Sequence, residues 1–199
     1  MLRFVFSFLL IIILAGCAVK PVTNANLVAH IHNLPDNWTV KGRIALKTRE
    51  EKFSANLEWQ QQHESYRLRL SKLIGGTLLV MEKKDGIVSL EIDGVNYKDK
   101  NAERLLRRAT GWTLPIDDFK FWISGYVNPD APRPMAVKKD ETSRLWSFQT
   151  QDSWQIEYKN YKVFSGKPLP YNMTIDKDDI QVKLRVNNWD FEQSNDQSG

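Results

Sequence analysis

Cysteine is almost absent from this sequence of 199 residues, because Cys17 is the only one. A single cysteine excludes an internal disulfide framework. Histidine is scarce too, and His30, His32 and His63 do not have the spacing of metal ligands. The chain has no Gly-x-Ser-x-Gly elbow, no phosphate-binding glycine loop and no dinucleotide fingerprint. We therefore predict that the protein is not an enzyme and that it binds no metal and no dissociable cofactor.

A concentrated charge of one sign is also missing. The 28 lysines and arginines exceed the 24 acidic residues only slightly, for a net charge of +4. Arg104, Arg107 and Arg108 form the only short basic cluster. Nucleic-acid binding needs a basic stripe, so no nucleic acid is expected as a partner. The small positive excess indicates at most a weak preference for anionic lipid or an acidic partner.

Long apolar segments are absent except at the start of the chain. Met1-Leu2-Arg3 is a short positive region, and Phe4 to Ala15 is apolar apart from Ser7. A helix needs about 20 apolar residues to span a bilayer, so this run is too short. Its length and its flanks predict that residues 1–16 are a signal peptide.

The residues that end this run, Leu14-Ala15-Gly16-Cys17, resemble the bacterial lipobox, in which small residues precede a cysteine that is acylated. The resemblance implies that Cys17 becomes the mature N-terminus and carries a covalent N-acyl diacylglycerol group. Several acyl chains anchor a protein stably, whereas a single chain gives marginal binding. Ala18, rather than an aspartate, follows the cysteine. By resemblance to the sorting rules of enteric bacteria, this implies the outer membrane, with the domain facing the periplasm. The alternative is an ordinary secretory signal followed by a chance cysteine.

The mature chain is long enough for one domain with a sizeable core. We expect three parts: a lipidated N-terminus and tether (17–26), a single domain (27–191) and a disordered tail (192–199). A short helix carrying Leu27, Ile31 and Leu34 is expected to open the domain, and Pro35 ends it.

Period-two alternation of apolar and polar residues then predicts a series of strands. The clearest example is the segment from Phe53 to Trp59, which alternates without a break. Asp85-Gly86 and Asp93-Gly94 predict tight hairpin turns. After residue 134 the strands resume, and the same alternation predicts that Trp146 and Phe148 share one face.

Two short helices are predicted in the middle of the chain. Asp99 or Asn101 caps a first helix that Gly111 ends, and Pro115 opens a second helix that Gly125 ends. The sum is a mainly β domain, with a curled antiparallel sheet of roughly ten strands and two inserted helices. The concave face of such a sheet would be apolar, and the helices would plug it. The seven tryptophans fit an apolar cavity there.

The predicted domain also carries a series of short motifs in a fixed order. They include Trp38-x-x-x-Gly42-Arg43, Leu57-x-Trp59, Tyr66-Arg67-Leu68, Gly111-Trp112-x-Leu114-Pro115, Trp122-Ile123-x-Gly125 and Trp154-x-Ile156-x-Tyr158. Their order, behind the lipobox, resembles the LolB family of outer-membrane lipoprotein receptors. The resemblance implies an unclosed half-barrel of about eleven strands with a short-helix plug over an apolar cavity.

The resemblance further implies a monomeric receptor of the lipoprotein localisation pathway. Such a receptor takes acylated lipoproteins from the periplasmic carrier LolA and inserts them into the outer membrane by affinity-driven transfer. Its partners would be LolA, cargo lipoproteins and outer-membrane lipid. One alternative is another lipid-anchored lipid-binding or outer-membrane assembly accessory protein. The other is a surface-anchored hydrolase with unrecognised carboxylates.

The segment Ser71 to Gly76 lies between two predicted strands and contains two branched aliphatic residues, Leu73 and Ile74. A turn rarely exposes two such residues. In the family, this loop presents an apolar side chain that helps to deliver cargo to the membrane, usually within Pro-Leu-Gly. By position Ile74 takes this role, but the missing proline leaves Leu73 open. The alternative is that both side chains fold back on the core.

The alternation defines one apolar face but not which of its residues would touch ligand. We assign the acyl-cavity lining to large apolar residues of that face and of the predicted helices. They are Leu57, Trp59, Leu68, Leu90, Trp146, Phe148 and Ile156 from the sheet, with Leu106 and Trp122 from the helices.

Overall fold

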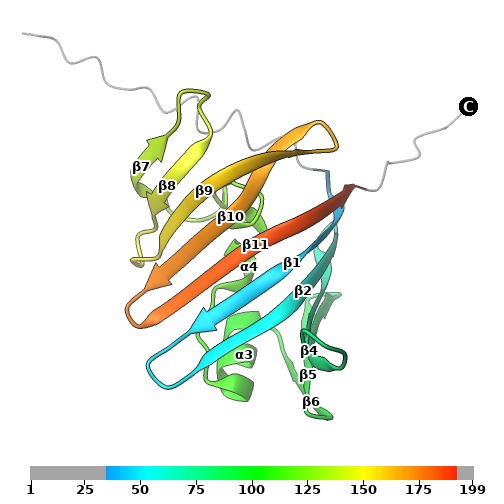
Figure 1. Cartoon of the computed structure of the whole chain (residues 1–199). Helices are drawn as coiled ribbons and strands as arrows, with labels where there is room; N and C mark the ends of the chain where they lie inside the picture. Colours follow the sequence, from blue (N-terminus) through cyan, green and yellow to red (C-terminus); the bar gives the residue numbers. More distant parts are fainter. Residues whose placement is uncertain (1–34, 192–199) are drawn as a thin grey trace, which may run out of the picture.

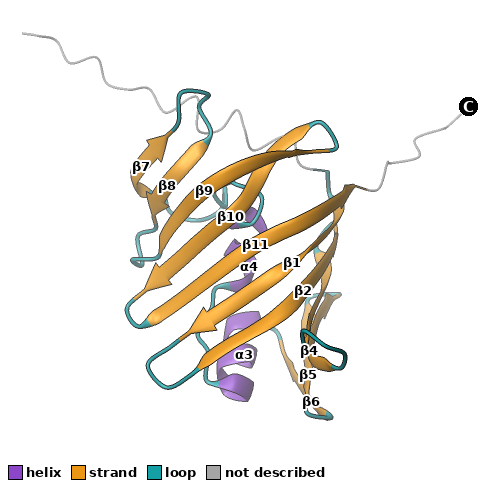
Figure 2. Ribbon diagram, in the orientation of Figure 1, coloured by secondary structure: helices purple, strands orange, loops and turns teal. Residues whose placement is uncertain are grey.

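The computed structural model describes residues 35–191, which form one antiparallel sheet of eleven strands with two short helices on its concave side (Figures 1 and 2). The strands are β1 (Asn37–Lys47), β2 (Lys52–Gln62), β3 (Ser65–Ser71), β4 (Thr77–Lys84), β5 (Ile87–Ile92), β6 (Val95–Asp99), β7 (Met135–Lys139), β8 (Leu145–Gln149), β9 (Gln155–Phe164), β10 (Lys167–Lys177) and β11 (Ile180–Phe191). The helices are α3 (Ala102–Thr110) and α4 (Ile116–Trp122). None of the helices in this range is long and apolar enough to cross a membrane.

The strand order is β6-β5-β4-β3-β2-β1-β11-β10-β9-β8-β7. Every neighbouring pair is consecutive in sequence except β1 and β11, so the sheet consists of two meanders joined at that pair. β6 and β7 are its free edges, and the sheet is an unclosed half-barrel. In Figure 1 the sheet curves around α3 and α4, which lie behind β11, β1 and β2. The prediction of a curled, unclosed antiparallel sheet with two helices is confirmed.

Gly42 is required where the two meanders meet. The register shifts there, because Lys41 faces Asn188 whereas Gly42 faces Val186, and Asn187 is left as the extra residue of a bulge. An added Cβ at Gly42 would lie 2.4 Å from the carbonyl oxygen of Arg185. This backbone oxygen cannot move without breaking the join, so the close approach explains the glycine in the first motif.

The predicted turns and helix ends are present. Asp85 and Gly86 both adopt positive φ in the β4–β5 turn. The side chain of Asn101 accepts a hydrogen bond from the backbone N–H of Arg104 at 2.7 Å, so Asn101 rather than Asp99 is the cap of α3. Asp99 instead accepts hydrogen bonds from the Arg104 guanidinium, which lower the pKa of the Asp99 carboxyl.

One facing prediction is wrong. Phe148 is buried, but Trp146 is 49% exposed, and the buried neighbour on β8 is Leu145. Lys138 pairs with Ser147 and Lys139 pairs with Leu145, so Trp146 has no partner on β7 and forms a bulge. The bulge breaks the alternation that the prediction assumed.

Several predictions fall outside the described residues. They are the signal peptide at 1–16, the lipidation of Cys17, the tether at 17–26, the helix with Leu27, Ile31 and Leu34, and the tail at 192–199. These stay predictions.

Candidate functional site

An apolar cavity of about 50 Å³ lies between the concave face of the sheet and the two helices. Strands β1 to β4 and β11 supply one wall, and α3, α4 and the segment between them supply the other. Every lining residue is apolar. Ligand pockets usually measure about 300–1,000 Å³, so this cavity is nearly closed, and a long alkyl chain enters only if the helices move away from the sheet.

Four of the residues selected from the sequence line this cavity. Leu57, Trp59 and Leu68 project from β2 and β3, and Leu106 projects from α3. All four are almost completely buried. The alternation of β2 and β3 places these sheet residues on the inner face, and the spacing in α3 places Leu105 and Leu106 against that face.

The other selected residues are not brought to the cavity. Leu90, Trp122, Phe148 and Ile156 are buried but do not line it. Trp122 packs with its ring centroid 6.3 Å from that of Phe148, and its carbonyl accepts a hydrogen bond of 2.9 Å from the Tyr158 hydroxyl. Side chains of α4 therefore fill the inner face next to β8 and β9 around Phe148. The bulge excludes Trp146 from this inner face, so the assignment of Trp146 to the lining is wrong.

Trp112, which the cavity assignment omitted, lines the cavity. It follows the C-cap glycine of α3, and its ring lies 5.1 Å from that of Phe53 on β2. Its indole N–H donates a hydrogen bond of 2.5 Å to the Glu51 carboxylate in the β1–β2 turn. Trp112 thus ties the chain after α3 to the β1–β2 hairpin. The motif that contains it was visible in the sequence, but its contact with a turn 61 residues away was not.

Polar contacts tie each helix to the sheet. The Arg104 guanidinium of α3 donates to Asp99 of β6, and Arg108 donates to the carbonyl of Lys98 at 3.1 Å. The Tyr158 hydroxyl of β9 donates to the Trp122 carbonyl of α4.

Two further ion pairs lie near the cavity. Lys83 of β4 pairs with Asp117 of α4 at 3.4 Å, and Lys120 of α4 lies 3.9 Å from Glu64. Both carboxylates are largely exposed, so each pair contributes less than about 1 kcal/mol. Over the cavity itself, the helices therefore meet the sheet mainly through apolar contact, which an alkyl chain can replace.

No charged residue lines the cavity. Tyr66, beside Met81 on the neighbouring strand, is buried, and its hydroxyl contacts the Met81 sulfur at 3.5 Å. Burial, followed by the nearby Asp117 carboxylate, raises the pKa of Tyr66, so the phenol stays neutral. Within residues 35–191, no group of three or more acidic, histidine or cysteine side chains could hold a metal ion. The apolar lining is suited to holding alkyl chains.

The loop between β3 and β4 projects from the sheet and exposes its apolar residues. Ile74 is 95% exposed and Leu73 is 54% exposed, so the alternative in which both fold back on the core is wrong. The backbone N–H of Lys72 donates to the carbonyl of Gly76 at 2.9 Å, and the Asn56 side chain donates to the carbonyl of Lys72 at 3.1 Å. These bonds hold the loop in place with Ile74 at its most exposed position.

The half-barrel with two helices over an apolar interior belongs to a known class of fold. It is similar to the crystal structure of a LolA superfamily protein from Nitrosomonas europaea, with a TM-score of 0.56 and 9% identity over 89% of this chain and 97% of that one. Identity this low shows a shared fold alone.

Sequence comparison then gives the family. The family model described as outer membrane lipoprotein LolB matches residues 36–189. Proteins named outer-membrane lipoprotein LolB from Shewanella putrefaciens and Shewanella frigidimarina are 33% and 32% identical over 182 residues, which is 90% of this chain and 85% and 89% of theirs. The chain belongs to the LolB family.

Proposed function

We propose that the protein is an outer-membrane lipoprotein, anchored through Cys17 with its domain in the periplasm, that receives acylated lipoproteins from the carrier LolA and inserts them into the outer membrane. The observation that carries this proposal is the cavity, which is lined only by apolar side chains and covered by two short helices. Membership of the LolB family supports it.

In this mechanism the acyl chains of the cargo displace α3 and α4 from the concave face of the sheet. Each buried methylene contributes about 0.8 kcal/mol, so a long chain offsets the loss of helix contacts. Leu106 and Trp112 leave the sheet with the helical segment, and Leu57, Trp59 and Leu68 then contact the alkyl chain. Transfer is driven by affinity alone, without nucleotide and without a covalent step, so the protein is not an enzyme.

Release of the cargo takes place at the β3–β4 loop. Ile74 stands outside the fold at 95% exposure, and no described residue needs it for packing. We assign to it the role of entering the membrane and bringing the cavity close to the lipid. Leu73, which is about half exposed, would add a second apolar side chain beside Ile74.

A handover assay tests the proposal. LolA loaded with a radiolabelled lipoprotein is mixed with residues 20–199 without the lipid anchor, and the two proteins are then separated. Cargo that moves to this domain without nucleotide supports the receptor function. Cargo that stays on LolA, when the same LolA still hands it to an authentic LolB, refutes it and leaves the general lipid-binding protein as the better reading.

A further inference from the structure

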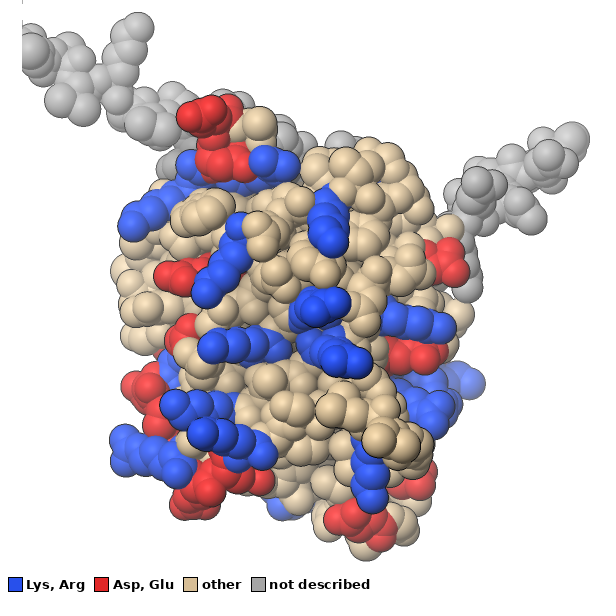
Figure 3. Space-filling view, in the orientation of Figure 1, with Lys and Arg blue, Asp and Glu red and all other residues tan. Residues whose placement is uncertain are grey.

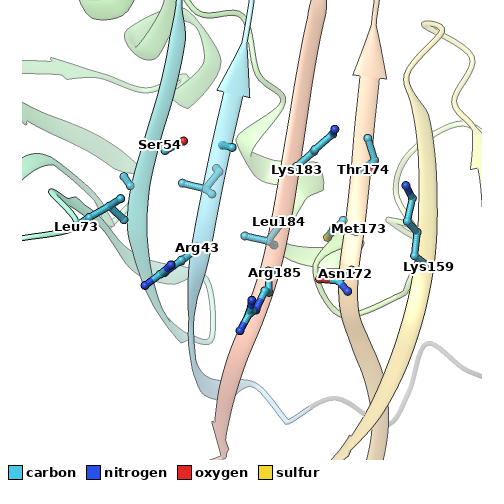
Figure 4. A pocket seen from close by; sticks show the side chains of 13 residues that line it. Arg43, Ser54, Leu73, Lys159, Asn172, Met173, Thr174, Lys183, Leu184 and Arg185 are labelled. Atoms are coloured by element: carbon cyan, nitrogen blue, oxygen red, sulfur yellow. The ribbon is translucent and has the colours of Figure 1, made fainter.

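The outer face of the sheet, opposite the helices, carries a hollow of about 430 Å³ that the lipoprotein transfer just described does not use (Figure 4). Strands β1, β2, β9, β10 and β11 contribute to it, together with Leu73 of the β3–β4 loop. Its charged lining residues are all basic: Arg43, Lys159, Lys183 and Arg185.

The strand register explains why this face is hollowed. Ala45 on β1 lies between Ser54 on β2 and Lys183 on β11, and Lys183 lies opposite Thr174 on β10. The small side chains of Ala45, Ser54 and Thr174 form a shallow floor. The long basic side chains stand around that floor, as Figure 4 shows for Arg43 and Arg185.

The basic side chains are placed against one another rather than against acids. Arg43 lies directly opposite Arg185 in the β1–β11 ladder, and like charges at such positions destabilise a sheet. Within the part of the chain that the structure describes, none of the four cations forms an ion pair. Arg185 does lie over the ring of Tyr171, at 5.7 Å, but this contact does not neutralise its charge.

Acidic residues stand at the sides of the hollow. Glu157 on β9 faces Thr174, and Glu58 on β2 faces Lys41, and neither lines the hollow. Figure 3 shows the same separation on this face, with blue side chains over its centre and red ones mostly near its margins. The hollow is therefore a local positive site that a bound anion would stabilise.

The position of the β3–β4 loop indicates which anion fits. Leu73 lines the hollow, and its neighbours Ile74 and Lys72 in the same loop are exposed. Apolar side chains next to cations match the boundary of a bilayer, where acyl chains meet phosphate. An acidic protein surface would satisfy the cations but would leave Ile74 without an apolar contact.

We propose that this hollow binds the phosphate headgroups of anionic phospholipids, with Arg43 and Arg185 as its principal ligands. Arginine binds phosphate through paired N–H groups, which suits two guanidinium groups side by side. The inference rests on the proposed function for one point, namely that the β3–β4 loop enters the membrane. It adds that the outer face turns toward the membrane and that docking depends on lipid charge.

The test uses the full-length anchored protein in two kinds of vesicle, one of phosphatidylcholine and one of equimolar phosphatidylcholine and phosphatidylglycerol. Asn187→Cys, in the exposed bulge of β11, carries a dye whose emission shifts when lipid displaces water. We expect the shift only with phosphatidylglycerol, and we expect salt to weaken it. Arg43→Gln with Arg185→Gln should lower the ratio of docked to undocked protein by about tenfold or more.

The matched control removes two exposed cations elsewhere, Lys98→Gln with Arg107→Gln, and should leave the shift unchanged. Equal emission in both kinds of vesicle, or an equal loss in the control, overturns the inference. A shift that needs added LolA instead of anionic lipid overturns it as well, because the hollow would then bind an acidic protein. Handover to the unsubstituted protein is measured in the same vesicles. Handover without lipid-dependent docking refutes this inference alone, whereas docking without handover refutes the proposed function alone.

Discussion

Replacing Ile74 by glutamate separates the membrane step from every other property of the protein. The side chain is 95% exposed, so Ile74→Glu removes no packing, and the free energy of unfolding should change by no more than about 0.5 kcal/mol. An isoleucine that enters lipid gains about 1.5–3 kcal/mol, and a carboxylate does not enter. A loss of about 2 kcal/mol corresponds to a roughly thirtyfold drop in membrane incorporation of cargo.

The assay starts from cargo already bound to the domain and follows its appearance in sedimented vesicles. Val163→Glu is the matched control, because Val163 is also an exposed apolar residue, at 72%, but lies on β9 near the β9–β10 turn. Receipt of cargo from LolA should be normal in both variants. The reasoning fails if incorporation is unchanged by Ile74→Glu, if Val163→Glu lowers it equally, or if receipt from LolA is lost as well.

Three further predictions concern the cavity and the sheet. Leu106→Gln places an amide in the cavity and should weaken retention of acylated cargo by about tenfold. Arg107→Gln, on the exposed side of the same helix, should leave retention unchanged. Equal retention of cargo by the two variants would contradict the assigned cavity. Phe148→Ala should lower the free energy of unfolding by about 3–5 kcal/mol in chemical denaturation, and a much smaller loss would show that the inner face around Phe148 is not tightly packed. Gly42→Ala pushes a methyl group against a backbone carbonyl and should lower the free energy of unfolding by on the order of 1–3 kcal/mol. The midpoint of thermal unfolding should fall accordingly. An unchanged midpoint would mean that β1 and β11 approach each other less closely than described.

Most of the fold follows from local patterns. The run from Phe53 to Trp59 keeps its alternation through the whole of β2, and Asp85-Gly86 forms the hairpin turn that the pair predicts. Asn101 and Gly111 bound α3 as expected. These features depend only on residues that are neighbours in sequence, so a reading of the chain can find them.

The bulges and the short edge strand could not be read in this way. Trp146 has the spacing of an inner residue, but an unpaired position in the β7–β8 ladder turns it outward. β7 spans only Met135–Lys139, and Ala136 within it has a φ of 49°, so no regular alternation marks the strand. A bulge depends on how a strand pairs with its partner, so the sequence of one strand alone does not predict it.

The position of the cavity on the concave face could not be predicted from the sequence either. Alternation put Leu57 and Ile156 on the same face, and both are indeed buried there. Only Leu57 lines the cavity. Ile156 lies opposite Phe148, and the ring of Trp122 packs against Phe148 there. Which part of a concave face stays open depends on how two helices lie across it, and that depends on contacts between distant segments such as Trp112 and Glu51.

The connection between the two free edges of the sheet has a mechanical consequence. Residues 100–134, which include both helices, are the chain segment that joins the last residue of β6 to the first residue of β7. This segment therefore connects the two edges of the open sheet across its concave side. A ligand that moves the helices away from the sheet therefore also pulls on the edge strands β6 and β7. We expect the distance between these two edges to change when the interior is filled.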